Sequence, residues 1–286
     1  MEGRQFVNQP YPSRVAATSA SNPNVTSDLD LALHAADVAD AVSLKGFESR
    51  RFSVERKADH SEVTEIDRAT ETAISEVLQS ARPDYSLYGE EHGVVGPADA
   101  RYQWVIDPID GTSNFVRGVP VWATLIALVG DGVPVLGVVA APALQRRWWA
   151  VRDLGAHSSV ANGEPRRLRV SATSELRKAS ASITVTESWH AAGKTSHLDR
   201  LQRGVARLRN YGDFWQHMLV AEGALDFAID AIGLGPYDIA AITTIVAEAG
   251  GAWSNRHGDS HWRSDSLVTS NGPLHNIVLQ ELNADR

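Results

Sequence analysis

The chain has 286 residues, of which 43% are hydrophobic and 22% are charged, a composition typical of a folded globular protein rather than a disordered one. Its formal net charge of −8 argues against a nucleic-acid partner, because a general nucleic-acid binder needs a basic face to neutralise phosphates. The absence of cysteine excludes disulfides, thiolate metal sites and a cysteine nucleophile.

The N-terminal segment differs in composition from the remainder of the chain. Residues 1–27 are rich in Ser, Asn, Pro and Ala and contain no continuous apolar core, so they resemble neither a secretory signal nor a helix. We expect them to form a flexible tail. No run of 18 or more apolar residues occurs, so we expect no membrane partner. A cysteine-free chain is compatible with a reducing compartment, and we expect a cytoplasmic location.

Two amphipathic helices are predicted after the tail. Apolar residues at helical spacing begin at Leu29, with Ser27 as the candidate cap. A second helix is predicted from Thr64, where Thr64 and Asp67 fit a capping box and an apolar stripe follows.

Strand patterns begin at residue 102 and then alternate with helical ones. A hairpin turn at Gly130-Asp131-Gly132 joins two of the predicted strands. The predicted strands are 102–106, 121–129, 134–140, 147–151, 166–170 (after an Asn162-Gly163 turn), 181–186, 225–230 and 266–269. The predicted helices are 196–208, 213–224, 238–249 and 273–283. This order predicts stacked helices and sheets, an α+β or mixed α/β sandwich.

Two carboxylates follow the first predicted strand. In WVIDPIDGTSNF, residues 104–115, the apolar run ends at Asp107, and Asp110 follows before Gly111 and Thr112. Side chains at a strand end can face a crevice rather than the core. Taken alone, the segment is equally well explained as a turn, since Asp, Pro and Gly are the usual turn formers.

Further acids also occupy predicted strand ends or helix starts. Glu90 follows the short apolar segment around Leu87, and Asp67 and Asp238 begin predicted helices, where acids are also ordinary caps. Glu90 and Asp238, together with Asp107 and Asp110, could supply an oxygen-only ligand set of the kind that Mg²⁺ prefers. Small residues that open a short helix after Asp110 would point free backbone N–H groups at an anion. The sequence therefore predicts a small phosphorylated substrate held between metal ions and a helix start.

Four ordered motifs resemble those of the inositol monophosphatase family of Mg²⁺-dependent, lithium-sensitive phosphatases. They are Lys57, Asp59, Val63, Thr64 and Asp67; Gly89-Glu90-Glu91; Trp104 to Phe115; and Tyr237-Asp238-Ile239-Ala240-Ala241. The resemblance covers roughly residues 28–284. It implies a layered α-β-α-β-α sandwich in a single phosphatase domain over residues 28–286, with an α+β half at about 28–145 and an α/β half at about 146–286. It also implies a homodimer.

The resemblance further implies a role for each motif residue. One Mg²⁺ would be held by Glu90, Asp107 and the backbone carbonyl of Ile109, a second by Asp107, Asp110 and Asp238, and a third, looser ion would lie near Glu90 and Asp67. Glu90, Thr112 and Asp67 would surround the attacking water as the catalytic residues. The phosphate would bind at Gly111, Thr112 and Ser113. Two to three Mg²⁺ ions are therefore expected.

Three longer segments are most similar to the bacterial L-histidinol-phosphate phosphatase branch of the family. These segments are 117–125, 143–150 and 209–214. Arg209, Gly212 and Asp213, which lie in or directly after one turn, are candidates for contacting the substrate. Asp213 would pair with the substrate ammonium, although a helix N-cap explains it equally well. Asp230 is a second candidate for the ammonium or for the imidazole. We expect hydrolysis of L-histidinol phosphate to L-histidinol and phosphate. The alternatives are an inositol-1-monophosphatase or another small phosphate-ester phosphatase, and a non-catalytic scaffold that binds metal and phosphate.

Overall fold

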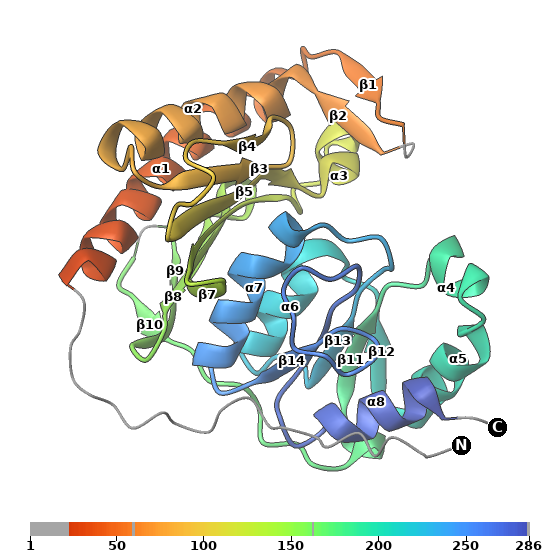
Figure 1. Cartoon of the computed structure of the whole chain (residues 1–286). Coiled ribbons are helices and arrows are strands. Elements are labelled where there is room, and N and C mark those ends of the chain that lie inside the picture. Colours follow the sequence, from red (N-terminus) through yellow and green to blue (C-terminus); the bar gives the residue numbers. More distant parts are fainter. Residues whose placement is uncertain (1–22, 59–60, 162, 285–286) are drawn as a thin grey trace, which may run out of the picture.

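Within residues 23–58, 61–161 and 163–284, which the computed structural model describes, helices and two large β-sheets alternate in five layers, α-β-α-β-α (Figure 1). The expected layered sandwich is therefore confirmed. No helix in these described residues is both long and apolar enough to cross a membrane.

The elements are as follows. The helices are α1 (Pro23–Ser49), α2 (Glu65–Ala81), α3 (Thr112–Arg117), α4 (Glu187–Ala191), α5 (Thr195–Gly204), α6 (Asp213–Ala221), α7 (Pro236–Glu248) and α8 (His275–Asn283), with short 3-10 turns at Pro142–Leu144 and Leu176–Lys178. The first sheet contains β3 (Ser86–Gly89), β4 (Gly93–Val95), β5 (Tyr102–Asp110), β6 (Ala123–Gly130), β7 (Val133–Ala141), β8 (Arg146–Val151), β9 (Gly155–Val160) and β10 (Arg166–Arg167). The second sheet contains β11 (Ser180–Ile183), β12 (Arg207–Arg209), β13 (Phe227–Ile229), β14 (Ala252–Ser254) and β15 (Val268–Ser270). A separate hairpin pairs β1 (Val54–Arg56) with β2 (Glu62–Thr64).

The first sheet runs in the order β10-β9-β8-β7-β6-β5-β3-β4, with β3 and β5 parallel and the other neighbours antiparallel. Both of its faces are covered, because successive side chains of a strand point to opposite sides. On β5, Trp104 and Ile106 pack with α1 and α2, whereas Val105 packs with α6 and α7. Since the central strand is buried on both faces, its sequence reads as a continuous apolar run.

Helices α6 and α7 fill the space between the two sheets (Figure 1). Apolar residues of α7, such as Ile242 and Ile245, are almost completely buried. On the far face of the second sheet, α5 and α8 pack against β11, β13 and β15 around Trp189 and Leu201. The N-terminal ends of α3, α6 and α7 are thereby left to build a site at the end of β5.

Several predicted boundaries need correction. Helix α1 begins at Pro23, so residues 23–27 are helical rather than part of a tail; proline is well tolerated in a first helical turn. Residues 1–22 lie outside the described part of the chain, as do Asp59 of the first motif and Asn162 of the predicted turn. Of the predicted strand 166–170, only Arg166–Arg167 form a strand, β10.

One further prediction has the wrong end and one strand was missed, because the local sequence pattern does not specify which strands pair. The helix expected over 196–208 ends at Gly204, and the chain then adds β12 parallel to β11. Strand β9 was not predicted, since GAHSSV contains no apolar run. The hairpin between β6 and β7 and the capping box at Thr64 are confirmed.

Candidate active site

Strand β5 carries the first two acids of the site. It continues to Asp110 rather than ending at residue 106, and its pairing with β6 is interrupted between Asp107 and Asp110. Pro108 explains the interruption, because proline has no N–H to donate to the ladder and is accommodated at irregularities. The Asp107 carboxylate folds back to accept the Ile109 N–H at 3.0 Å. The irregularity therefore turns the two carboxylates and the Ile109 carbonyl out of the regular ladder.

Three of the predicted metal ligands lie together. Asp107, Asp110 and Asp238 each offer a carboxylate oxygen, and these oxygens lie within 4.8 Å of one another. Asp238 belongs to the first turn of α7 and accepts the Gly235 N–H at 2.6 Å, while Asp110 accepts the Phe214 N–H of α6 at 2.7 Å. Asp107 is buried and the other two acids are partly exposed, and a set of oxygen donors with this spacing fits a hard divalent cation such as Mg²⁺.

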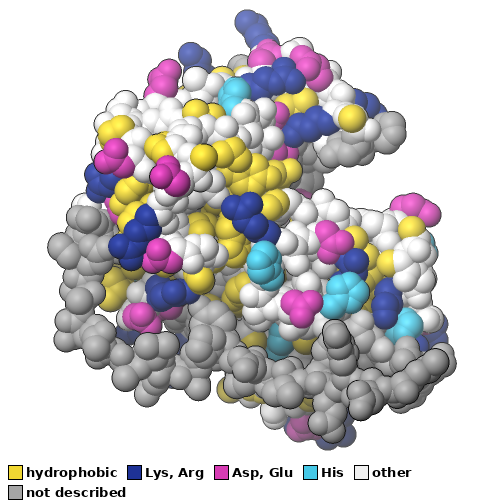
Figure 2. Space-filling model, viewed as in Figure 1, with side chains coloured by type: hydrophobic (Ala, Val, Ile, Leu, Met, Phe, Trp, Pro, Cys, Tyr) yellow, Lys and Arg dark blue, Asp and Glu magenta, His cyan; other side chains and the backbone are white. Residues whose placement is uncertain are grey.

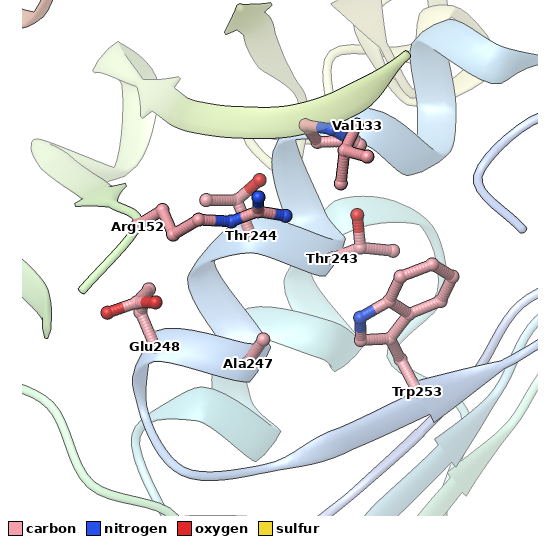
Figure 3. A pocket seen from close by; sticks show the side chains of 8 residues that line it. Val133, Arg152, Thr243, Thr244, Ala247, Glu248 and Trp253 are labelled. Carbon is pink, nitrogen blue, oxygen red and sulfur yellow. The ribbon is translucent and has the colours of Figure 1, made fainter. Parts of the chain in front are cut away.

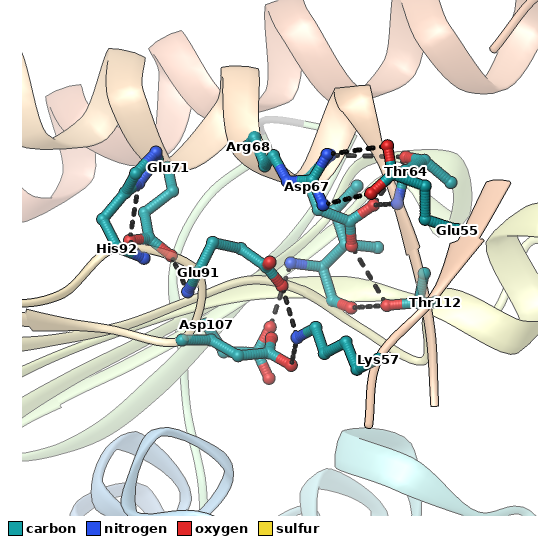
Figure 4. A network of polar contacts seen from close by, with 12 residues as sticks. Glu55, Lys57, Thr64, Asp67, Arg68, Glu71, Glu91, His92, Asp107 and Thr112 are labelled. Atoms are coloured by element: carbon teal, nitrogen blue, oxygen red, sulfur yellow. Dashed lines mark hydrogen bonds and ion pairs between the residues drawn. The ribbon is translucent and has the colours of Figure 1, made fainter. Parts of the chain in front are cut away.

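Asp67 caps α2 with one carboxylate oxygen and faces Thr112 with the other. Its Oδ2 accepts the Thr64 N–H at 2.8 Å and the Thr64 hydroxyl at 2.5 Å, which completes the cap of α2. Its Oδ1 faces Thr112, whose Oγ1 lies 3.0 Å away and also 2.9 Å from the Ile109 carbonyl oxygen. The helix cap thus fixes a fully buried carboxylate against the Thr112 hydroxyl (Figure 4).

Glu90 lies beside the three-acid group rather than within it. Lys57, on the loop between β1 and β2, places its Nζ 2.7 Å from Glu90 Oε1 and 2.6 Å from Glu91 Oε1. The ion pair with Glu91 is drawn in Figure 4. Lys57 belongs to the first sequence motif, but the motif alone does not indicate which acids it contacts.

A buried glutamate anchors the turn that carries Glu90. The Glu71 carboxylate of α2 accepts the backbone N–H groups of Glu91 at 2.8 Å and His92 at 2.9 Å, and His92 Nδ1 lies 3.0 Å from the same carboxylate (Figure 4). A Cβ added at Gly89 would lie 1.9 Å from Glu71 Oε1. Glycine at this position is therefore required for the close approach of the turn to α2.

Replacement of Gly89 by Ala is expected to lower kcat/KM for phosphate release about tenfold to a hundredfold, because the displaced turn moves Glu90 away from the acids. The melting temperature should also fall, since Glu71 loses its two amide partners. Gly204→Ala is the matched control, because its added Cβ meets only Leu176 at 3.4 Å. Equal activity of the two variants would refute the positioning of Glu90 by this turn.

Helix α3 begins next to the acids. Gly111 precedes it with a left-handed φ of 85°, and a Cβ there would lie 3.1 Å from the Val121 carbonyl oxygen and 3.4 Å from Asp213 Oδ2. The first N–H groups of a helix have no acceptor within the helix. The Ser113 hydroxyl instead donates to Glu62 at 2.9 Å and is exposed, so only the backbone of Ser113 remains for a phosphate.

Asp213 does not cap α6 with its side chain. It adopts a left-handed φ of 48°, which costs about 1–3 kcal/mol for a residue with a Cβ and often occurs at functional sites. Its Oδ2 accepts the Asn114 Nδ2–H at 2.9 Å, and Asn114 donates also to the Val121 carbonyl at 2.9 Å. The N-cap interpretation is therefore wrong, and the carboxylate lies beside Gly111 instead.

The three remaining substrate candidates, Asp230, Arg209 and Gly212, are placed differently. Asp230, at the end of β13, is 7% exposed, and its negative charge acts on Asp110, Asp213 and Asp238. The exposed Arg209 donates to the Leu208 carbonyl at 2.6 Å, while Gly212 has a φ of 71° and precedes α6. Asp230 thus joins the acidic cluster, whereas nothing in the described contacts links the Arg209 side chain to it.

Burial raises the pKa of five carboxyls of the site, those of Glu90, Asp107, Asp110, Asp213 and Asp238. The pKa values of Asp107 and Asp110 lie well above their usual range, because burial is reinforced by the negative charges of neighbouring acids. Burial also raises the pKa of Asp238 to about 6 and those of Glu90 and Asp213 to about 7, even though Lys57 lowers that of Glu90. Such mutually raised carboxyls are typical of a site built for a cation.

The cluster lies where the molecular surface is hollowed. The space-filling view shows a notch between the part formed by β1, β2 and α3 and the part that carries α4 (Figure 2), and α7 begins at its inner end (Figure 1). A separate cavity, lined by Thr243, Thr244 and Glu248 of the C-terminal half of α7 together with Arg152 and Trp253, has a volume of about 20 Å³ (Figure 3). That volume holds about one water molecule, so it excludes a substrate.

Comparison with known proteins agrees with this geometry. The model of the inositol monophosphatase family matches residues 24–285. The histidinol-phosphatases of Mycobacterium tuberculosis and Streptomyces coelicolor are 46% and 45% identical, and each alignment covers at least 90% of this chain and 98% of the relative. The solved structure of an inositol monophosphatase (IMPase) from Thermotoga maritima is 31% identical, with a TM-score of 0.79 over 90% of this chain and 97% of that one. The chain belongs to the inositol monophosphatase family.

Proposed function

We propose that the protein is a Mg²⁺-dependent phosphatase that hydrolyses L-histidinol phosphate to L-histidinol and inorganic phosphate, a step of histidine biosynthesis. Two acids beyond the metal-ligand set support this substrate. If two Mg²⁺ ions balance Glu90, Asp107, Asp110 and Asp238, the charges of Asp213 and Asp230 remain. An ammonium group on the alcohol side of the substrate would balance one of them.

The metal ligands are proposed on the same basis. Asp107, Asp110 and Asp238 would bind a Mg²⁺ ion, and Glu90 with Asp107 and the Ile109 carbonyl a second; a third would lie near Glu90 and Asp67. Bound Mg²⁺ would supply Lewis-acid stabilisation of the phosphate and of the leaving oxygen, and would make the attacking water more acidic.

The protein's own residues would position the water and the phosphate. Thr112 Oγ1, held between Asp67 Oδ1 and the Ile109 carbonyl, can donate to one of them and accept from the water. As Thr112 accepts a proton from the water, the proton of its own hydroxyl can pass to Asp67. Glu90 is the second candidate to accept a proton from the water. The backbone N–H groups of Gly111, Thr112 and Ser113 would hold the phosphate oxygens. Attack in line with the leaving oxygen needs no covalent intermediate, in keeping with a chain that has no cysteine.

The substrate would lie with its phosphate at α3 and its amine at α6. Asp213 approaches Gly111 closely enough that a Cβ there would meet Asp213 Oδ2 at 3.4 Å. A single small phosphate ester can therefore reach both the phosphate seat and the acid. The identities of 45–46% with two histidinol-phosphatases, against 31% with the Thermotoga maritima IMPase, also favour this substrate over an inositol phosphate.

Phosphate release should be measured with L-histidinol phosphate and with inositol 1-phosphate, with Mg²⁺ present and with Li⁺ added. We expect histidinol phosphate to give the higher kcat/KM, and lithium to inhibit. Equal or faster hydrolysis of inositol 1-phosphate would overturn the substrate assignment. Absence of hydrolysis across a panel of phosphate esters would instead favour a non-catalytic scaffold. We also propose a homodimer, which light scattering after size-exclusion chromatography would test.

A further inference from the structure

A buried histidine with no role in the proposed chemistry holds Asp230. His217, on α6, is completely buried, and its Nε2 lies 3.0 Å from Asp230 Oδ2. Its Nδ1 lies 2.8 Å from the hydroxyl of Thr269 on β15. The other oxygen of Asp230 accepts the Ala231 N–H at 2.7 Å. Both carboxylate oxygens are therefore fixed, one by the backbone and one by the imidazole.

The hydrogen bonds are satisfied with an uncharged ring. An ionised carboxylate only accepts, so Nε2 carries the hydrogen that it donates to Asp230. In the neutral ring Nδ1 is then the acceptor, and the Thr269 hydroxyl donates to it. An uncharged His217 can thus make both hydrogen bonds without neutralising the Asp230 carboxylate, which is left to pair with a cationic partner.

That partner is expected inside the site. Asp230 is 7% exposed and lies 3.0 Å from His217, which follows Asp213 by one turn of α6, so Asp230 borders the acidic cluster on the side of Asp213. We infer that His217 is a positioning residue for substrate selection: it holds the Asp230 carboxylate toward the cationic or imidazole end of an amine-bearing phosphate ester. This inference rests on the proposed function.

The role is separable from folding and from phosphate binding. On α6 the apolar side chains of Phe214 and Met218 are fully buried in the main core and anchor the helix. His217 contacts Asp230 and Thr269 rather than the acids proposed to bind metal. Loss of its donor should therefore affect the alcohol half of the substrate more than the phosphate half.

The test compares two substrates in the full-length protein with Mg²⁺. The measured quantity is the ratio of kcat/KM for L-histidinol phosphate to kcat/KM for glycerol 2-phosphate. His217→Phe keeps a ring but removes both hydrogen bonds, and we expect it to lower this ratio about tenfold, mainly through a higher KM for L-histidinol phosphate. His217→Gln keeps an amide donor and should recover part of the ratio. Asp230→Asn, with nearly unchanged shape, should lower the ratio similarly, and the double variant should lower it no further.

The outcomes separate the two claims. If the unaltered protein shows no preference for L-histidinol phosphate over glycerol 2-phosphate, the proposed function fails. If the unaltered protein shows that preference and His217→Phe retains it fully, the positioning role fails. The positioning role also fails if His217→Phe loses activity equally toward both esters and His217→Gln recovers none of it. If His217→Phe does not fold, His217→Gln and Asp230→Asn decide the question by the same ratio, and an unchanged ratio in both refutes the inference.

Discussion

The Asp110→Asn variant is expected to release phosphate about 1,000-fold more slowly than the unaltered protein, or more slowly still. Asp110 is one of three acids whose oxygens lie within 4.8 Å of one another. The amide has nearly the same shape as the carboxylate but lacks its charge, so cation binding and the charge balance of the site both weaken. Initial rates of phosphate release at saturating Mg²⁺ would measure the effect.

The same variant is expected to fold at least as well as the unaltered protein when metal is removed. Burial and the charges of Asp213 and Asp238 raise the pKa of Asp110 well above its usual range, so its ionised form destabilises the metal-free state. An Asn side-chain oxygen can still accept the Phe214 N–H, which lies 2.7 Å from the Asp110 carboxylate. Thermal unfolding in EDTA should therefore show an equal or higher melting temperature.

Asp131→Asn is the matched control for this change. Asp131 lies in the exposed hairpin between β6 and β7, pairs with Arg101 and adopts a φ of 49°, a conformation that Asn tolerates. We expect full activity in this variant. An Asp110→Asn protein with turnover within tenfold of the control would refute the assignment of Asp110 as a metal ligand.

Local sequence predicted the acidic site because its members occupy positions that local rules recognise. A capping box placed Asp67 at the start of α2, and the structure shows that the cap uses one oxygen and leaves the other for Thr112. The apolar run before Asp107 predicted a buried strand, although Pro108 lets the strand continue through an irregularity to Asp110. Periodicity and turn chemistry are sufficient for these positions because each depends on neighbours within a few residues.

Contacts between distant segments could not be predicted in this way. Lys57 meets Glu90 across 33 residues of sequence, and Asn114 meets Asp213 across 99. His217 and its neighbour Gln216 are buried polar residues on a largely apolar helix, and nothing in the sequence around His217 specifies a partner on β13. The direction of Asp213 also depends on a left-handed backbone that pattern analysis does not detect. Pairing of buried polar groups is set by the packing of layers, which local sequence leaves open.

Mg²⁺ is expected to raise the melting temperature of the protein, and to raise it more at pH 8 than at pH 5. The pKa of Asp238 is raised to about 6 and those of Glu90 and Asp213 to about 7, chiefly by burial. In the unfolded chain such carboxyls titrate near pH 4. Between about pH 4 and pH 7 the metal-free folded protein therefore binds more protons than the unfolded chain.

The sign of the pH dependence follows from this difference in bound protons. When the folded state binds more protons, the free energy of unfolding decreases as the pH rises through the window. A carboxyl raised by two to three pKa units contributes a loss on the order of 3 kcal/mol by pH 8. Thermal unfolding in EDTA should accordingly show a melting temperature that falls from pH 5 to pH 8 as repulsion within the cluster increases.

A divalent cation reverses this trend because it binds the ionised carboxylates and competes with protons. At a Mg²⁺ concentration about 100 times its Kd the folded state gains roughly 2.7 kcal/mol, which corresponds to a rise of about 5–10 °C for a domain of this size. The rise should shrink toward pH 5, where protons already neutralise the cluster, and should be smaller at every pH in Asp110→Asn. If Mg²⁺ raises the melting temperature equally at pH 5 and pH 8, or equally in Asp110→Asn and the unaltered protein, the stabilising ion binds somewhere other than at Asp107, Asp110 and Asp238.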